Sequence, residues 1–156
     1  MTAHNFTLKR LDLPEMAQAS RIHRASFDDR LPWLKGLHTP QEDQWFYENC
    51  IFPQCEVWTA FAPEMAGIIA FKTGWIEQLY ILPEFQGRGI GSTLLKQAQQ
   101  TLSHLQLWTF QRNIQAQKFY GKHGFTAIDQ TDGHDNEEKE PDILFEWRKS
   151  GSEYTI

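Results

Sequence analysis

Cysteine, positive charge and long apolar runs are all scarce in this chain. Its 156 residues include two cysteines, and 15 basic residues against 20 acidic ones give a formal net charge of −5. Cys50 and Cys55 have no second cysteine or histidine pair to complete a metal site, so we expect free thiols and no metal. The negative charge argues against nucleic acid or an anionic membrane as the main partner. No stretch resembles a secretory signal or a transmembrane helix, which predicts a cytoplasmic location.

Two common phosphate-binding patterns are also missing. A dinucleotide fingerprint needs the order G-x-G-x-x-G, but counting from Gly87 the third glycine position holds Ser92. A P-loop needs Lys directly after a glycine, and no Lys follows a glycine in this turn. The glycines of this turn therefore belong neither to a dinucleotide-binding fingerprint nor to a P-loop.

What the chain does contain is a strand, a glycine-rich turn and a helix in direct succession over residues 76–100. Gly87, Gly89 and Gly91 carry no Cβ atom, so an anion can approach the backbone closely. The helix that follows has N–H groups without intrahelical partners at its start, and its dipole is positive there. The stretch therefore predicts a site for a phosphate or pyrophosphate.

The pattern that fits this turn is Gln-x-x-Gly-x-Gly, with Gln86, Gly89 and Gly91 in the fixed positions. It resembles the acyl-CoA pyrophosphate loop of the GNAT superfamily of N-acetyltransferases. The resemblance implies acetyl-CoA as cosubstrate, held by the loop and by the strand before it. The implied cofactor-binding residues in these two elements are Leu79, Tyr80, Ile81, Gln86, Gly87, Arg88, Gly89, Ile90, Gly91 and Ser92.

A second motif follows downstream, where a buried strand over 105–110 leads into a helix over 113–125. Asn113 is placed to cap this helix, and the sequence fits the GNAT pattern N-x-x-A-x-x-F-Y-x-x-x-G-F. The resemblance implies that Asn113 contacts the pantetheine and that the Tyr120 hydroxyl faces the thioester sulfur. The two residues lie about two helical turns apart, so they can share a helix face. Core packing is the alternative reading of Tyr120.

The order of the expected elements agrees with the GNAT fold across nearly the whole chain. We expect one α/β domain over residues 1–156, with a mixed, mainly antiparallel sheet of six to seven strands, splayed at the acyl-CoA site and flanked by helices. Turn residues and period-two patterns predict the strands, and Pro14 and Thr39-Pro40 mark the starts of two early helices. The expected strands cover residues 6–11, 56–62, 66–72, 75–82, 105–110, 126–130 and 143–147, and the first helix runs from Pro14 to about Ser26.

The expected chemistry is acetyl transfer to a primary amine of a small molecule or protein. An amine with a pKa of about 10.4 must lose a proton first, so a base is helpful. Glu77 is the best-placed acidic side chain, because it shares a strand face with Leu79 and Ile81. We therefore expect Glu77 and Tyr120 to be the catalytic pair. An equally weighted alternative is that Glu77 faces solvent or pairs with a Lys or Arg of a neighbouring strand.

The acceptor itself is the least determined part of the prediction. GNAT enzymes that acetylate ribosomal protein N-termini carry a Glu where this chain has Trp108, which puts that activity in doubt. The aromatic segment over 27–53 fits either an aromatic wall for an amine or helix packing, and we favour packing. A homodimer is left open. The alternative to an enzyme is an acyl-CoA-binding sensor domain without turnover.

Overall fold

The computed structural model describes residues 6–61 and 63–150. Its seven strands follow the order β1-β2-β3-β4-β5-β7-β6, so the fold is a mixed, mostly antiparallel open sheet with flanking helices. This confirms the fold class expected from the sequence. The strands are β1 (Thr7–Arg10), β2 (Glu56–Phe61), β3 (Met65–Lys72), β4 (Gly74–Ile81), β5 (His104–Phe110), β6 (Thr126–Thr131) and β7 (Asp142–Arg148). The predicted end of the second strand, Ala62, lies outside the described residues.

The helices begin and end close to the positions that the sequence indicates. Asp12 and Thr39 both form capping boxes, with Glu15 and Glu42 as the reciprocal partners. Leu31 ends α1 because the residue before a proline disfavours the helical region. The α-helices are α1 (Met16–Arg30), α2 (Pro40–Phe46), α3 (Phe52–Gln54), α4 (Ile90–Thr101) and α5 (Ile114–Lys122); short 3₁₀ turns cover Leu13–Glu15, Pro32–Leu34 and Pro83–Phe85.

Two features of the early helices differ from the sequence prediction. The first helix reaches Arg30, four residues beyond the expected Ser26, and an ion pair between Arg24 and Asp28 at 3.4 Å supports this extra turn. Between α2 and α3 the backbone forms a π-helix over Tyr47–Ile51. A π segment has no simple sequence signature, and it is found often at functional sites.

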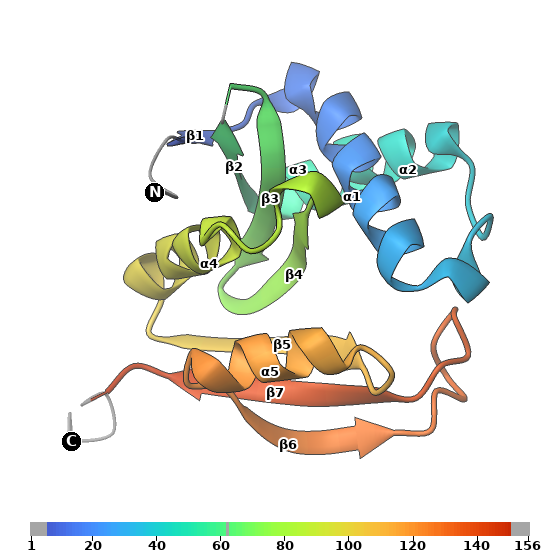
Figure 1. Cartoon of the computed structure of the whole chain (residues 1–156), viewed down its shortest axis with the longest axis vertical. Helices are drawn as coiled ribbons and strands as arrows, with labels where there is room; N and C mark the ends of the chain where they lie inside the picture. The colour runs from blue at the N-terminus through green and yellow to red at the C-terminus, as the bar shows by residue number, and fades with distance from the viewer. Residues whose placement is uncertain (1–5, 62, 151–156) are drawn as a thin grey trace. The chain divides into compact units, whose positions relative to one another are not determined.

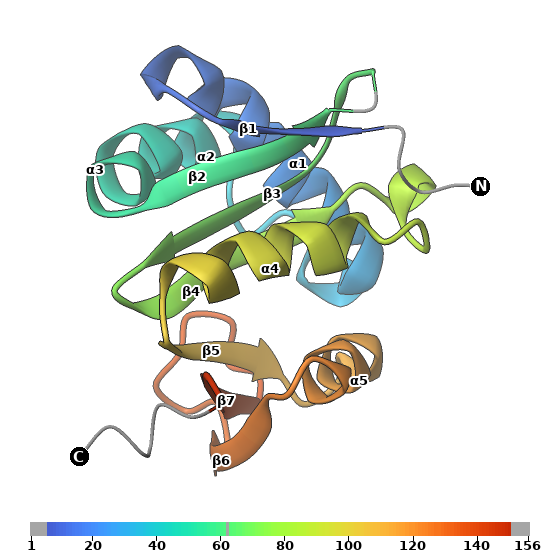
Figure 2. The same ribbon diagram turned by 90° about the vertical axis from the view of Figure 1, so that its left-hand side faces the viewer.

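The chain divides into two compact units. The first comprises the described residues up to Lys72 together with Ile76–Ala98, and the second comprises Thr73–Trp75 and the described residues from Gln99 onward. In the first unit, α1 and α4 lie on opposite sides of the strands (Figure 2). A buried cluster joins the inner face of α1 to Tyr47, Ile51, Val57 and Ile68. The partly buried Tyr80 and Leu82 of β4 pack against the same cluster.

In the second unit, α5 lies beside β5 and β7 (Figure 1). Its core is aromatic: the ring of Tyr120 lies 5.5 Å from that of Phe125 and 6.1 Å from that of Phe145. Phe145 of β7 is opposite Leu107 of β5, and both side chains are buried. Tyr120, which is 8% exposed, thus anchors α5 to this core.

No helix among residues 6–61 and 63–150 is long and apolar enough to cross a membrane.

Candidate active site

The glycine-rich turn lies between the 3₁₀ turn at Pro83–Phe85 and the start of α4. Gly87 and Gly89 both have φ of 81°, a conformation that side chains with a Cβ atom rarely adopt. The first helical bond of α4 runs from the Thr93 N–H to the Gly89 carbonyl at 3.1 Å. The N–H groups of Ile90 and Gly91 therefore stand before the hydrogen-bond ladder of a twelve-residue helix. This arrangement fits an anion at the turn, as expected from the sequence.

Charge at this turn comes from Arg88, which is exposed. Its guanidinium lies over the ring of Phe85, 5.2 Å from the ring centre. A cation–π contact of this kind leaves the N–H groups at the edge of the guanidinium able to reach a phosphate. Phe85 itself is buried, so the contact anchors Arg88 beside the turn.

The end of β4 brings two sets of backbone groups to opposite edges. The Leu82 N–H donates to the Ala66 carbonyl of β3 at 2.9 Å. Because backbone groups of successive strand residues alternate between edges, the N–H groups of Leu79 and Ile81 face away from β3. The register of β4 with β5 joins Gly74 to Leu105 and Trp75 to Gln106, at the start of β4. Leu79 and Ile81 lie beyond this pairing.

Gly67 of β3 permits the close approach of β4. A Cβ atom at this position would lie 2.5 Å from Cδ1 of Ile81 and 2.9 Å from the Tyr80 carbonyl oxygen. A larger residue at position 67 would displace the strand that leads into the glycine turn. No sequence pattern pointed to this glycine, because its neighbour lies on another strand.

Glu77 pairs with Lys72, with 3.4 Å between Oε2 and Nζ, and each side chain is 35% exposed. The geometry is the one that the sequence analysis weighed as the alternative to a catalytic role. The thiol of Cys55 lies in the field of this carboxylate, and burial first, then Glu77, raises the pKa of Cys55 to about 11. Cys55 is a free, protonated thiol at neutral pH.

Asn113, at the start of α5, and Tyr120, within that helix, both lie in the second unit. Asn113 caps α5, and its Oδ1 accepts a hydrogen bond from the Ala116 N–H at 3.1 Å, as the sequence predicts. Within the part of the chain that the structure describes, its Nδ2 makes no hydrogen bond. The Tyr120 ring takes part in the aromatic core described above. The packing role weighed for Tyr120 is therefore present, and it orients the phenol.

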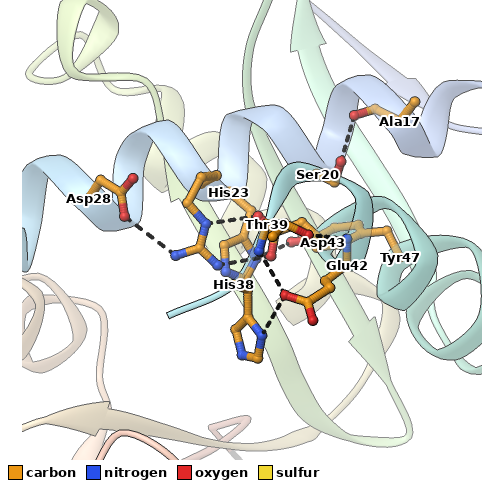
Figure 3. Close-up of polar contacts among 10 residues, drawn as sticks. Ala17, Ser20, His23, Asp28, His38, Thr39, Glu42, Asp43 and Tyr47 are labelled. Carbon is orange, nitrogen blue, oxygen red and sulfur yellow. Dashed lines mark hydrogen bonds and ion pairs between the residues drawn. The ribbon is translucent and has the colours of Figure 1, made fainter. Parts of the chain in front are cut away.

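A polar network that sequence reasoning did not find joins α1 to α2 and to the π-helix that follows it (Figure 3). Arg24 binds both carboxylate oxygens of Asp43, at 2.8 and 2.9 Å, and this contact raises the pKa of the guanidinium. His23 Nδ1 lies 2.7 Å from the Tyr47 hydroxyl. Burial, reinforced by Arg24, lowers the pKa of His23 to about 3, so the imidazole is neutral. Burial also raises the pKa of Tyr47 well above its ordinary value.

Two histidines and the aromatic segment over 27–53 have different surroundings. His38 lies 3.6 Å from Glu42, and His123 caps the end of α5 through the Phe119 carbonyl at 2.9 Å. Trp33 and Trp45 are exposed, at 47% and 60%, whereas Tyr47 is fully buried. Packing explains Tyr47, as favoured, but not the two tryptophans. Among the described residues no group of three or more His, Cys, Asp or Glu side chains is placed to hold a metal ion.

Comparison with known proteins places these features in one family. Residues 23–125 match the model of the acetyltransferase (GNAT) family. Over 102 residues the chain is 28% identical to the peptidyl-lysine N-acetyltransferase YiaC of Escherichia coli, covering 65% of this chain and 62% of that protein. An uncharacterized N-acetyltransferase of Archaeoglobus fulgidus is 32% identical over 73 residues, covering 36% of this chain and 50% of its own length. The chain thus spans less than two thirds of these curated relatives.

Solved structures show the same fold over almost the whole chain. Apo YjaB of Escherichia coli matches with a TM-score of 0.75 and 20% identity, over 93% of this chain and 99% of that one. The PaiA N-acetyltransferase of Thermoplasma acidophilum in complex with coenzyme A matches with a TM-score of 0.70 and 20% identity, over 92% and 98%. At this identity the likeness concerns the fold.

Proposed function

The chain belongs to the acetyltransferase (GNAT) family, and on that premise we propose that it transfers an acetyl group from acetyl-CoA to a primary amine. The observation that carries the proposal is the turn at Gly87–Gly89, which has two positive φ angles directly before the N-terminus of α4. We further propose that residues 1–156 act together as one catalytic domain. The cytoplasmic location stays a prediction from the sequence.

In this proposal the cosubstrate is bound mainly by backbone groups. The turn and the first residues of α4, with Arg88, take the pyrophosphate. The strand Leu79-Tyr80-Ile81 takes the pantetheine and the acetyl carbonyl, because the N–H groups of Leu79 and Ile81 face away from β3. Asn113 contributes its Nδ2 to the pantetheine, since its Oδ1 caps α5.

The reaction requires one bond to form and one to break. The neutral amine nitrogen attacks the acetyl carbonyl carbon, the C–S bond breaks, and the amine proton leaves to a base. Tyr120 donates a hydrogen bond or proton to the departing thiolate, a role that suits a phenol held by aromatic packing. Glu77 is the proposed base, directly or through water, and in the resting protein Lys72 shares its carboxylate.

The acceptor class is a primary amine of a small molecule or a protein. A relative named as a peptidyl-lysine N-acetyltransferase supports including protein lysines among the acceptors to be tested. The test is calorimetry with acetyl-CoA, together with thiol release measured over a panel of lysine peptides, polyamines and amino acid derivatives. Turnover on one class assigns the acceptor. Binding without turnover on any amine would favour an acyl-CoA sensor, and absence of binding would reject the proposal.

Tyr120→Phe tests the proposed acid. We expect kcat to fall roughly 10- to 1000-fold with the acetyl-CoA Kd nearly unchanged, because only one hydroxyl is removed from a retained ring. The check is steady-state kinetics with product release shown not to be rate-limiting. An unchanged kcat would leave Tyr120 with its packing role alone.

Glu77→Gln tests the proposed base. The variant should lower kcat/KM at neutral pH and lose less as the pH approaches the pKa of the amine, because the acceptor then arrives neutral. Glu64→Gln, an exposed acidic residue in the turn before β3, is the matched control. If the pH–rate profiles of the Glu77 variant and the wild type coincide, deprotonation does not depend on Glu77.

A further inference from the structure

One face of α1 carries a polar stripe formed by His23, Ser26 and Arg30. The spacings of three and four residues place the three side chains on the same side of the helix. All three contact the end of β4 or the residue that opens the glycine turn. None of them belongs to a family motif that the sequence analysis identified, so the stripe is a feature of the tertiary structure.

The contacts follow the chain from strand to turn. The His23 ring lies 4.4 Å from the Tyr80 ring, measured between ring centres. One turn further along α1, the Ser26 hydroxyl donates to the Ile81 carbonyl at 2.9 Å. At the last residue of α1, Nη2 of Arg30 donates to Oε1 of Gln86 at 2.9 Å. Helix α1 therefore contacts Tyr80, Ile81 and Gln86 in their sequence order.

Gln86 links Arg30, Ser26 and Ile81 into one hydrogen-bond network. Its Nε2 donates to the Ile81 carbonyl at 3.0 Å, so this carbonyl accepts from both Ser26 and Gln86. A guanidinium can only donate, which requires the oxygen of the Gln86 amide to face Arg30 and its nitrogen to face Ile81. The two contacts thus hold the amide in a single orientation. Both lone pairs of the Ile81 carbonyl are occupied by protein donors.

Because Gln86 is the first residue of the turn, this hydrogen-bond network also fixes where the turn begins. Gly87, with φ of 81°, follows directly, and the turn has few side chains to hold it. The same network fixes Ile81, whose N–H and carbonyl both face the edge of β4 that points away from β3. A ligand that spans from the strand end to the turn needs both of these groups at a constant separation.

We propose that Arg30, assisted by Ser26, is a positioning residue for acyl-CoA, which acts through Gln86 and Ile81. This inference rests on the proposed acyl-CoA function of the turn. Arg30 holds the entry to the pyrophosphate turn, and Ser26 holds the strand end that carries the pantetheine. Neither side chain needs to touch the ligand.

The test is the affinity of Arg30→Met for two probes, measured by calorimetry for CoA and by NMR titration for acetyl-pantetheine, which lacks the pyrophosphate. We expect the Kd for CoA to rise about tenfold, the value of one charge-assisted hydrogen bond, with little change for acetyl-pantetheine. Arg30→Lys keeps a donor for Gln86 and should recover most of the affinity. Arg21→Met, on the exposed side of α1, is the matched control and should bind CoA like the wild type.

A double-mutant cycle separates positioning from general destabilisation. If Arg30 acts through Gln86, then Arg30→Met should have no further effect on the CoA Kd in a Gln86→Leu background. Ser26→Ala, a mild change on the same stripe, should raise the Kd about threefold and serves if Arg30→Met does not fold. A CoA Kd that stays at the wild-type value in Arg30→Met and Ser26→Ala, whatever the melting temperature, would overturn the inference. Failure of the wild type itself to bind CoA would instead reject the proposed function, and the inference with it.

Discussion

The glycine turn and the pair of helices α1 and α2, with the π-helix that follows α2, are two regions of the same compact unit, and they differ in the bonds that define their backbone. In the turn, the defining bonds join residues three or four apart, such as Gln86 to Pro83 at 3.3 Å and Thr93 to Gly89 at 3.1 Å. In the helix pair, side chains 19 and 24 residues apart make the defining contacts, in Arg24–Asp43 and His23–Tyr47. The backbone bonds of the turn are therefore local, and Arg30 of α1 adds one distant contact at its entry, Gln86, whereas the helix pair depends on distant side chains throughout.

The two regions also differ in what their polar groups are able to bind. In the helix pair, Arg24 and Asp43 neutralise each other, because the guanidinium binds both oxygens of the buried carboxylate. The turn instead offers backbone N–H groups and the exposed Arg88. A region whose donors are satisfied supports the fold, whereas a region with donors outside its own ladder suits a ligand. Substitutions in the two regions should therefore separate stability from cofactor affinity.

The largest expected effect is on stability, in Arg24→Met. Removing the guanidinium leaves the Asp43 carboxylate buried without its bidentate partner, which should lower the free energy of unfolding by about 3 kcal/mol. Urea unfolding measures the change, and calorimetry should show an unaltered CoA Kd in the folded variant. Lys9→Met, which removes an exposed ion pair with Glu15, is the control and should cost about 1 kcal/mol or less. A loss for Arg24→Met as small as the control's would show that the pair does not hold the helices.

The complementary change is Gly89→Asp in the turn. It adds a side chain at a positive φ and a negative charge beside the expected pyrophosphate, so the CoA Kd should rise roughly 100-fold. Gly36→Asp is the matched control, because Gly36 has φ of 90° and lies outside the turn. It reproduces the backbone strain without the effect on binding. Wild-type affinity in Gly89→Asp, at constant salt, would contradict the assignment of the turn.

The smallest effect is a pH dependence that belongs to the helix pair. Because the pKa of His23 falls from 6.5 to about 3 on folding, the unfolded chain binds a proton that the folded chain does not between these values. The free energy of unfolding should therefore be at its full value above about pH 6.5 and should fall by about 1.4 kcal/mol per pH unit below it. Urea unfolding at pH 7, 6 and 5 measures this slope.

His23→Leu should remove that part of the slope, and His134→Gln, in the exposed connection between β6 and β7, should retain it. An identical slope in His23→Leu and the wild type would show that His23 is not kept neutral by burial. The CoA Kd at constant pH gives an independent check that the turn itself is intact.

Local patterns predicted what local geometry builds. The capping box at Thr39, the cap at Asn113 and the turn at Gly87–Gly89 each depend on residues that are close in sequence, and the structure has all three. The end of α1 at Arg30 depends on Pro32 but also on the ion pair from Arg24 to Asp28, and the sequence analysis placed it four residues early. The π-helix at Tyr47–Ile51 was not predicted, because no residue propensity favours this backbone form; its Tyr47 and Ile51 side chains are buried in the core.

The sequence by itself indicated the family through the resemblance of two motifs to GNAT patterns. Periodicity, caps and glycine positions predicted the order of strands and helices and the turn that fits a pyrophosphate. Only the tertiary structure decided that Arg30 and Gln86 share a hydrogen bond, that Lys72 pairs with Glu77, and that His23 is neutral. The physical reason is that a hydrogen bond, an ion pair and a desolvation cost depend on distances between atoms. For residues far apart in the chain, the packing of α1 against β4 and α2 sets those distances.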